Sequence, residues 1–271
     1  MAFRLEHYLD RIGLTNVALG ARGLAAVQMA HMRAIPFENI DPLLGSVPSL
    51  APEDVFEKLV SGRRGGYCFE HNALFGRALE ALGYAPRAVL ARVFDNAGRS
   101  GARSHHAFVV EAEGTDWLCD TGFGGHGALS PLRLDVPGPQ GVPNGTYRVR
   151  GCARHGEIVL ERQADEVWLA QYGFDKTPAR AIDFEAANFL CARWEGAPFS
   201  TNLLMAFHAE HGRVALFNRA LTWGQPPGAT QSELASCGEL ERLLRETCGL
   251  KVGRDLVSRV WDKIAAAPVR R

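Results

Sequence analysis

The chain has 271 residues, long enough for one large domain or for two to three small ones, each with a core of its own. Hydrophobic residues make up 46% and charged residues 22%, as is ordinary for a soluble globular protein. The 30 Lys and Arg residues balance the 30 Asp and Glu residues, which excludes an extended basic surface for nucleic acid and an acidic tail. An anionic ligand must therefore meet a local group of basic side chains.

Cysteine spacing and hydropathy narrow the class of protein further. The N-terminus carries charges throughout, which argues against a signal peptide, and no run of about 18 apolar residues predicts a membrane span. We therefore expect a cytoplasmic protein without membrane partners. The six cysteines form no CxxC pair, which argues against a zinc ribbon or a dense disulfide scaffold: Cys68, Cys119, Cys152, Cys191, Cys237 and Cys248.

The N-terminal part, residues 1–84, is predicted to be a helical bundle. His31 is expected to be a histidine at the edge of the core, and Phe37 lies in a non-periodic stretch where it either packs in a loop or lines a pocket. Apolar residues recur three and four positions apart, as on the inward face of a helix, in four segments: residues 5–12, 23–33, 52–60 and 68–82.

The fourth of these helices begins at Cys68. Gly65 and Gly66 allow a sharp turn directly before it, and Gly83 is suited to end it. The unpaired N–H groups and the positive end of the helix dipole favour a thiolate, so we expect the pKa of Cys68 to be lowered. The alternative is a small buried cysteine with a packing role.

After Gly83 the hydrophobic period changes from 3.6 to 2, which indicates strands. Several short strands with frequent turns predict a small antiparallel barrel: residues 87–94, 105–112, 117–120, 146–151, 157–162 and 167–172. Asp183 is expected to cap a further helix. The rest of the chain is predicted to hold two strands, joined through Glu210, His211 and Gly212, and then two helices: residues 203–208, 213–218, 232–247 and 254–266.

A catalytic thiolate requires a histidine as base and a third group that orients the imidazole, and one hairpin offers both. If residues 113–114 form a two-residue turn, Asp120 and His105 lie on the same side of the sheet while His106 points the other way. A bulge between them would reverse this parity. We therefore predict His105, rather than His106, as the partner of Cys68.

Two other kinds of site are disfavoured. The glycine-rich residues 122–125 lack the GK[ST] of a phosphate-binding loop, and we expect them to form a tight turn that projects Phe123 toward a substrate. No metal site is expected, because the spacing of the candidate ligands matches no compact zinc motif: His71, His105, His106 and Cys119.

The sequence resembles the arylamine N-acetyltransferases along nearly its whole length. The resemblance implies an α+β fold made of a helical bundle (1–84), an antiparallel β-barrel (85–190) and a C-terminal α/β lid (191–271). The helix that carries the cysteine is then expected to pack on the barrel, as in the core of papain-like thiol enzymes. The resemblance is carried by RGGYCFEHN at 64–72, SH at 104–105, DTGFGG at 120–125, YLDRIGL at 8–14, IPFEN at 35–39 and PFSTN at 198–202.

The same resemblance implies acetyl-coenzyme A (acetyl-CoA) as donor and an acetyl-cysteine intermediate with ping-pong kinetics. The implied acceptors are arylamines, arylhydroxylamines or hydrazines, as in xenobiotic metabolism. Cys68 is implied as nucleophile, His105 as general base and Asp120 as the carboxylate that orients it. Phe37, Phe123 and Gly124 are implied as substrate-binding residues. Ser104 and Thr121 depart from the residues usual in the family at those positions, without affecting the triad.

Further expectations concern the surroundings of the site. Arg64 and Glu38 resemble a structural ion pair, and backbone N–H groups at the start of the Cys68 helix and in the 122–124 turn could hold an oxyanion. Arg213 and Arg219 are candidates for the basic group that meets coenzyme A. The alternatives are a cysteine hydrolase with the same triad and a non-catalytic binding module.

Overall fold

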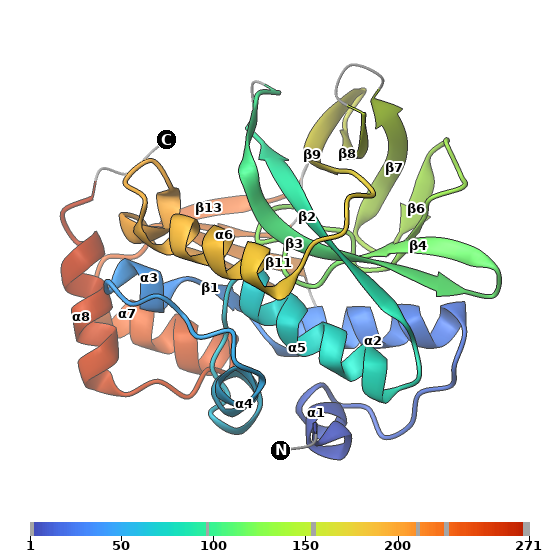
Figure 1. The fold of residues 1–271 in the computed structure, drawn as a ribbon. Coiled ribbons are helices and arrows are strands. Elements are labelled where there is room, and N and C mark those ends of the chain that lie inside the picture. The colour runs from blue at the N-terminus through green and yellow to red at the C-terminus, as the bar shows by residue number, and fades with distance from the viewer. Residues whose placement is uncertain (1–2, 96–97, 153–155, 210–211, 225–227, 268–271) are drawn as a thin grey trace.

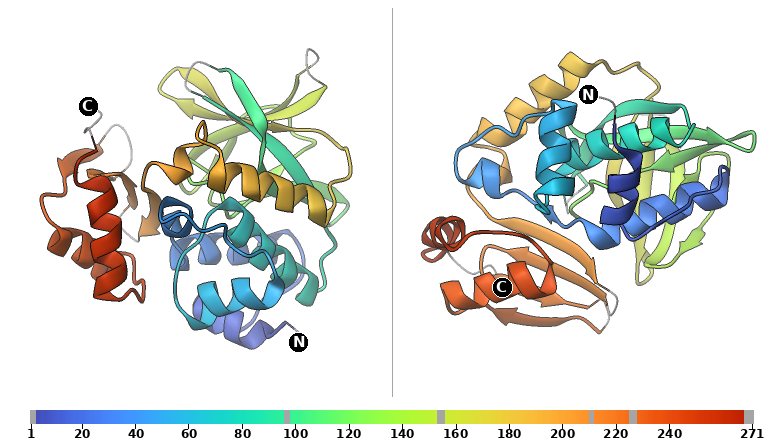
Figure 2. Two further views of the ribbon diagram at one scale, coloured as in Figure 1. Left: turned by 60° about the vertical axis from the view of Figure 1, so that its left-hand side comes forward. Right: turned by 90° about the horizontal axis from the view of Figure 1, so that it is seen from below.

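A layer of helices lies against an antiparallel sheet that curls toward a barrel, and a second, smaller sheet stands beside them with its own helices (Figures 1 and 2). The computed structural model describes residues 3–95, 98–152, 156–209, 212–224 and 228–267. Among these residues, no helix is long and apolar enough to cross a membrane.

The N-terminal helices follow the predicted hydrophobic periods. Their apolar faces pack together and against the inner end of the barrel sheet, so that α5, the helix predicted to begin at Cys68, lies directly beneath that sheet (Figure 1). The helices are α1 (Leu5–Arg11), α2 (Ala21–Ala34), the short α3 (Ile40–Leu43), α4 (Pro52–Phe56) with its π-helical continuation η1 (Glu57–Ser61), and α5 (Cys68–Ala81).

Eight strands form the larger sheet, in the order β5-β4-β3-β2-β9-β8-β7-β6. The sequence did not predict β5 and β6, because two or three residues are too short to show a period. The strands are β2 (Pro86–Phe94), β3 (Ser100–Ala112), β4 (Thr115–Cys119), β5 (Leu132–Arg133), β6 (Gln140–Val142), β7 (Gly145–Cys152), β8 (Glu157–Ala164) and β9 (Val167–Phe174).

The smaller sheet joins distant parts of the chain. Its first strand, β1 (Phe37–Glu38), comes from the segment predicted to be non-periodic and pairs with β10, with Phe37 opposite Ala206. The predicted turn at 210–211 lies outside the described residues. The remaining elements are β10 (Leu204–Ala209), β11 (Gly212–Phe217), β12 (Ala220–Trp223), β13 (Thr230–Glu233), α7 (Cys237–Arg242) with its continuation η3 (Leu243–Thr247), and α8 (Arg254–Ile264).

Two helix starts differ from the prediction. The helix expected from residue 232 is preceded by β13 and begins after Ser236, whose Oγ accepts the N–H of Glu239 at 3.3 Å. Asp183 does cap α6 (Ala181–Arg193), but from the third helical position rather than from the N-cap itself, by accepting the N–H of Arg180 at 2.8 Å. The predicted boundary between residues 190 and 191 falls inside α6, and the division into three segments stays a prediction.

The hairpin of β3 and β4 has the predicted register. Glu113 and Gly114 form the two-residue turn with φ angles of 56° and 74°, and Ala112 pairs with Thr115. Farther along, β3 carries a bulge against β2, because His105 pairs with Ala91 while Arg103 pairs with Arg92. Ser104 is the extra residue between them, and such bulges free a backbone group from the ladder.

Candidate active site

The start of α5 places Cys68 in the interior, where it is 4% exposed. Glu70, two residues farther along the helix, accepts the N–H of Tyr67 at 3.1 Å and so satisfies one unpaired donor at the helix start. The first turn of α5 is thereby held in place on the side that faces the barrel.

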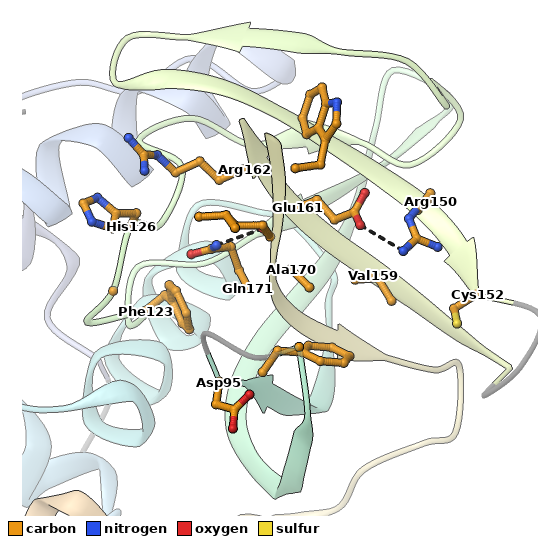
Figure 3. A pocket seen from close by; sticks show the side chains of 15 residues that line it. Asp95, Phe123, His126, Arg150, Cys152, Val159, Glu161, Arg162, Ala170 and Gln171 are labelled. Atoms are coloured by element: carbon orange, nitrogen blue, oxygen red, sulfur yellow. Dashed lines mark hydrogen bonds and ion pairs between the residues drawn. The ribbon is translucent and has the colours of Figure 1, made fainter. Parts of the chain in front are cut away.

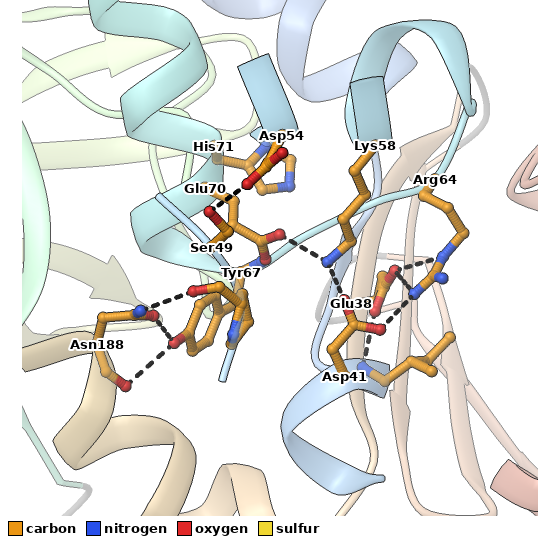
Figure 4. A network of polar contacts seen from close by, with 12 residues as sticks. Glu38, Asp41, Ser49, Asp54, Lys58, Arg64, Tyr67, Glu70, His71 and Asn188 are labelled. Carbon is orange, nitrogen blue, oxygen red and sulfur yellow. Dashed lines mark hydrogen bonds and ion pairs between the residues drawn. The ribbon is translucent and has the colours of Figure 1, made fainter. Parts of the chain in front are cut away.

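A network of charged side chains fastens this helix start to its neighbours (Figure 4). Lys58 Nζ lies 2.6 Å from Glu70 and 2.6 Å from Asp41. Arg64 Nη2 lies 2.7 Å from Glu38, and this ion pair confirms the one predicted from the sequence. Because Glu38 belongs to β1 and Lys58 to η1, the network ties α5 to both segments.

The state of the Cys68 thiol differs from the expectation. Burial raises the pKa of Cys68 well above its usual range, and neighbouring Cys191 and Asp120 raise it further. The N–H of Phe69 at the helix start lowers the pKa, as predicted, but burial has the larger effect. The neutral thiol is therefore favoured, and Sγ donates to the carbonyl oxygen of Ser104 at 3.8 Å.

Asp120 and His105 are brought together as the hairpin register predicted. His105 Nε2 lies 2.7 Å from Asp120 Oδ2, and both side chains are buried. Oδ1 of Asp120 accepts from Asn72 Nδ2 at 3.0 Å and from the N–H of Gly122 at 2.8 Å. Burial acts to raise the pKa of Asp120, but His105 and these hydrogen bonds together lower it below its usual value.

The ionised carboxylate determines which ring nitrogen of His105 carries the proton. Because Asp120 can only accept, Nε2 of His105 donates, and Nδ1 of the neutral ring is left as a proton acceptor. The ring is enclosed by Phe123 and Tyr172, with centroid distances of 5.3 and 4.8 Å. His105 is thus a preoriented base.

His106 has a different environment. Its ring stacks against Phe184, with centroids 4.1 Å apart, and its buried Nε2 has no hydrogen-bond partner among the described residues. Burial lowers the pKa of His106 to about 3, so the ring is neutral. It shares no hydrogen bond with Asp120 in the described structure, which agrees with the predicted parity.

Two supporting residues were not predicted as part of the site. Asn72 donates from Nδ2 to the carbonyl of His106 at 2.7 Å as well as to Asp120, and it lies one helical turn after Cys68. The spacing of four residues between Cys68 and Asn72 places both on one face of the helix, and this was the sequence signal that could have predicted the role of Asn72. Gln28 accepts the N–H of Asp120 at 3.2 Å, and nothing in its sequence surroundings indicates this contact.

A cavity of about 330 Å³ opens beside the thiol; we call it the Cys68 cavity. All three residues expected to bind substrate line it, while Asp120 stands behind His105. The sequence assigned no role to four other wall residues, Val93, Pro198, Phe199 and Leu204, three of which come from the 3₁₀ helix η2 (Pro198–Ser200) and from β10. The lining consists of Phe37, Cys68, Val93, Ser104, His105, Gly122, Phe123, Gly124, Gly125, Pro198, Phe199 and Leu204.

Close backbone approach explains the glycines on one side of this cavity. A Cβ on Gly122 would lie 2.7 Å from the carbonyl oxygen of Cys68 and 2.8 Å from its Cα. A Cβ on Gly124 would lie 2.6 Å from the ring of Phe37. Only a residue without a side chain therefore allows this turn to pass so close to Cys68 and to the ring of Phe37.

The two arginines proposed to meet coenzyme A have different surroundings. Arg213 Nη2 donates to the carbonyl oxygen of Gly124 at 2.7 Å, which places it directly behind the turn. Arg219 Nη2 lies 2.8 Å from Glu233, so its charge already has a partner. Contact of either residue with coenzyme A stays a prediction.

A second buried polar chain runs from α1 to β1. Tyr8 Oη lies 2.9 Å from His31 Nδ1, His31 Nε2 lies 2.9 Å from His71 Nδ1, and His71 Nε2 lies 3.1 Å from the carbonyl oxygen of Pro36. Since that carbonyl can only accept, His71 donates to it, His31 donates to His71, and Tyr8 donates to His31. Among the residues that the structure describes, no cluster of His, Cys, Asp and Glu is arranged to hold a metal ion.

Comparisons with known proteins agree along nearly the whole chain. Residues 22–257 match a family model described as N-acetyltransferase. The arylamine N-acetyltransferase of Escherichia coli (strain K12) is 35% identical over 252 residues, covering 92% of this chain and 89% of its own. That of Mycolicibacterium smegmatis is 36% identical over 275 residues, covering 97% and 98%.

Solved structures give the same result. The arylamine N-acetyltransferase from Salmonella typhimurium superposes with a TM-score of 0.89 at 32% identity, over 95% of this chain and 97% of its own. The Mycobacterium marinum arylamine N-acetyltransferase in complex with CoA superposes with a TM-score of 0.89 at 30% identity, over 96% and 99%. The α+β fold predicted from the sequence is confirmed by these structures.

Proposed function

This chain belongs to the arylamine N-acetyltransferase family, a family of acyltransferases, and we propose that it acetylates its acceptors through an acetyl-Cys68 intermediate. The donor is acetyl-CoA, and the acceptors are arylamines, arylhydroxylamines or hydrazines. The observation that carries the proposal is the His105–Asp120 hydrogen bond of 2.7 Å at the edge of a cavity that also contains the Cys68 thiol. The relative solved with CoA supports the choice of donor.

In the first half-reaction His105 acts as base and then as acid. The Cys68 thiol gives its proton to Nδ1 of His105, and the sulfur attacks the acetyl carbonyl carbon. The bond between that carbon and the sulfur of coenzyme A breaks, and the departing thiolate takes the proton from the imidazolium. Nδ1 of His105 is the atom that accepts this proton, because Nε2 donates to Asp120.

The second half-reaction uses the same groups. The acceptor nitrogen attacks the carbonyl carbon of acetyl-Cys68 and gives a proton to His105, and the carbon–sulfur bond breaks. The Cys68 sulfur then recovers the proton. Throughout, Asp120 keeps the ring in one tautomer and stabilises its charged form, which is the role of the carboxylate in related triads.

Backbone donors and apolar walls complete the proposed mechanism. The N–H of Phe69 at the start of α5 and N–H groups of the 122–124 turn could hold the developing oxyanion. Phe37, Phe123 and Phe199 line the Cys68 cavity with apolar surface, which suits an aromatic acceptor. These walls also limit the access of water that would otherwise hydrolyse the intermediate.

Intact-protein mass spectrometry after mixing with acetyl-CoA tests the proposal, with Cys68→Ala as the control. We expect a gain of one acetyl group that is absent from the control and is discharged by an added arylamine. Release of coenzyme A without an adduct would instead favour direct transfer or a hydrolase, and a protein with neither adduct nor release would contradict the proposal.

We further propose a role in xenobiotic metabolism, because the proposed acceptors include arylamines and hydrazines of foreign origin. We also propose a cytoplasmic location. Loss of resistance to a toxic arylhydrazine in cells that lack the protein, restored by the wild type and not by Cys68→Ala, is the expected result. Unchanged resistance would contradict the role.

A further inference from the structure

Two partly buried arginines beside the glycine-rich turn have no carboxylate partner among the described residues. Nε of Arg162 and Nε of Arg213 are both buried without a hydrogen-bond partner among the described residues. No ion pair joins either of them to a described carboxylate, although Arg213 donates from Nη2 to Gly124. Arg162 has a hydrogen-bond partner in Tyr147, and Arg213 has one in the carbonyl of Gly124. Both partners are neutral, so the two guanidinium groups are suited to meet an anionic ligand.

Arg162 lines a second cavity, of about 720 Å³, which we call the barrel cavity (Figure 3). His126 lines it too, and Phe123 and Gly125 line both this cavity and the Cys68 cavity. The two spaces therefore share the wall formed by the turn after Asp120. A molecule that reaches from the thiol past Phe123 would meet Arg162.

The carboxylates nearby do not neutralise these arginines. Glu161 lines the barrel cavity but pairs with Arg148 at 2.6 Å and with Arg150 at 2.9 Å. Burial, with the charges of Arg213 and Arg162, lowers the pKa of His126 to about 4. Asp95, the other acidic residue of the lining, pairs with Arg99 at 2.7 Å. The described carboxylates of the barrel cavity are therefore paired with other arginines, and Arg162 and Arg213 act on His126 as positive charges.

We propose that Arg162 and Arg213 form an anion-binding site next to the Cys68 cavity, for either the phosphates of the acyl-CoA donor or the carboxylate of an anionic aromatic amine. Guanidinium groups match both anions because their planar donors can form two parallel hydrogen bonds. The proposal rests on the acetyltransferase function above and adds to it the residues that select a charged substrate.

Steady-state kinetics of Arg162→Gln with four pairs of donor and acceptor distinguish a site for the donor's phosphates from a site for the acceptor's carboxylate. The donors are acetyl-CoA and S-acetyl-N-acetylcysteamine, which lacks phosphates; the acceptors are 4-aminobenzoate and the neutral 4-methylaniline. We expect KM to rise at least tenfold for one anionic partner, because a charge-assisted hydrogen bond is lost. The pair without anions should keep its KM.

A rise confined to acetyl-CoA assigns the site to phosphates, and a rise confined to 4-aminobenzoate assigns it to a carboxylate. Unchanged KM values, or an equal rise for the neutral pair, would overturn the proposal. Arg213→Gln is expected to act in the same direction. Arg148→Gln is the matched control, because Arg148 already pairs with Glu161, and its KM values should stay the same.

Binding measured without turnover separates this proposal from the proposed function. Calorimetry on Cys68→Ala, with inorganic pyrophosphate and with benzoate as probes, should show binding of one probe that is weakened at least tenfold when Arg162→Gln is added. If the wild type transfers no acetyl group but this binding persists, the function fails and the anion site stands. If neither probe binds, the site fails whatever the kinetics of acetyl transfer.

Discussion

Cys68 and Cys191 donate to the same acceptor, the carbonyl oxygen of Ser104, over distances of 3.8 and 3.6 Å. The bulge in β3 makes Ser104 an extra residue in the ladder, which leaves its carbonyl free to accept both thiols. Cys191 comes from α6, so a segment far away in the sequence shapes the surroundings of the nucleophile. After burial, its proximity is the next largest effect that raises the pKa of Cys68.

Replacing the neighbouring thiol should leave the reactivity of Cys68 nearly unchanged at neutral pH. Burial raises the pKa of Cys191 to about 12, so at pH 7.5 this thiol is neutral and its removal takes away no charge. In Cys191→Ala we expect the rate at which iodoacetamide alkylates Cys68 to change by less than about twofold, because the thiolate fraction controls this rate. Peptide mass spectrometry over time measures the rate at Cys68. Cys248→Ala, in the core of the smaller sheet, is the control, and a rate at least tenfold higher in Cys191→Ala alone would contradict the expectation.

The carboxylate behind His105 should matter for catalysis far more than for folding. Asp120→Asn keeps the shape of the side chain but allows the wrong tautomer of His105, so kcat/KM for acetyl transfer should fall about 10²- to 10⁴-fold. Asp116→Asn, on the same hairpin but partly exposed, should have less than a twofold effect. A fall of less than tenfold in Asp120→Asn, with an unchanged circular dichroism spectrum, would count against the triad.

The turn beside Cys68 should not tolerate a side chain. In Gly122→Ala the new Cβ would meet the backbone of Cys68 at less than 3 Å, so either the turn or the start of α5 must shift. We expect kcat to fall at least about tenfold, because small displacements at a reacting centre are costly. Gly151→Ala, where a Cβ meets nothing within 4 Å, is the control. Equal activity of the two variants is the outcome that would refute this reasoning.

The buried histidine chain should make stability depend on pH. Burial lowers the pKa of His71 to about 4, whereas an imidazole in the unfolded chain has a pKa of about 6.5. The unfolded chain thus binds a proton that the folded chain does not. The contribution of His71 to stability is complete above about pH 6.5 and is lost as the pH falls toward 4.

Urea unfolding at pH 7 and pH 5 measures this effect. Between these values the wild type should lose about 2 kcal/mol through His71 alone, and His71→Gln should lose about 2 kcal/mol less than the wild type. His7→Gln, which changes an exposed histidine, should behave as the wild type. If all three proteins lost the same stability, the assigned role of His71 would be wrong.

Local patterns in the sequence predicted those parts of the site that depend on neighbours along the chain. The start of α5 at Cys68 followed from a double glycine and a helical period. The register that brings His105 to Asp120 followed from a two-residue turn and the alternation of a strand. Where local signals competed, the prediction was less accurate: Ser232 has helix-like surroundings but lies in β13, because pairing with β12 decides its conformation.

The sequence by itself predicted the order of the proposed nucleophile, base and carboxylate and determined the family to which the chain belongs, because motifs and spacings are properties of the linear chain. Only the tertiary structure decided the protonation of Cys68, its proximity to Cys191 and the unpaired charges of Arg162 and Arg213. Those properties depend on burial and on distances between segments far apart in the sequence. Desolvation therefore outweighs the helix dipole at Cys68, although the residues around it predicted the reverse.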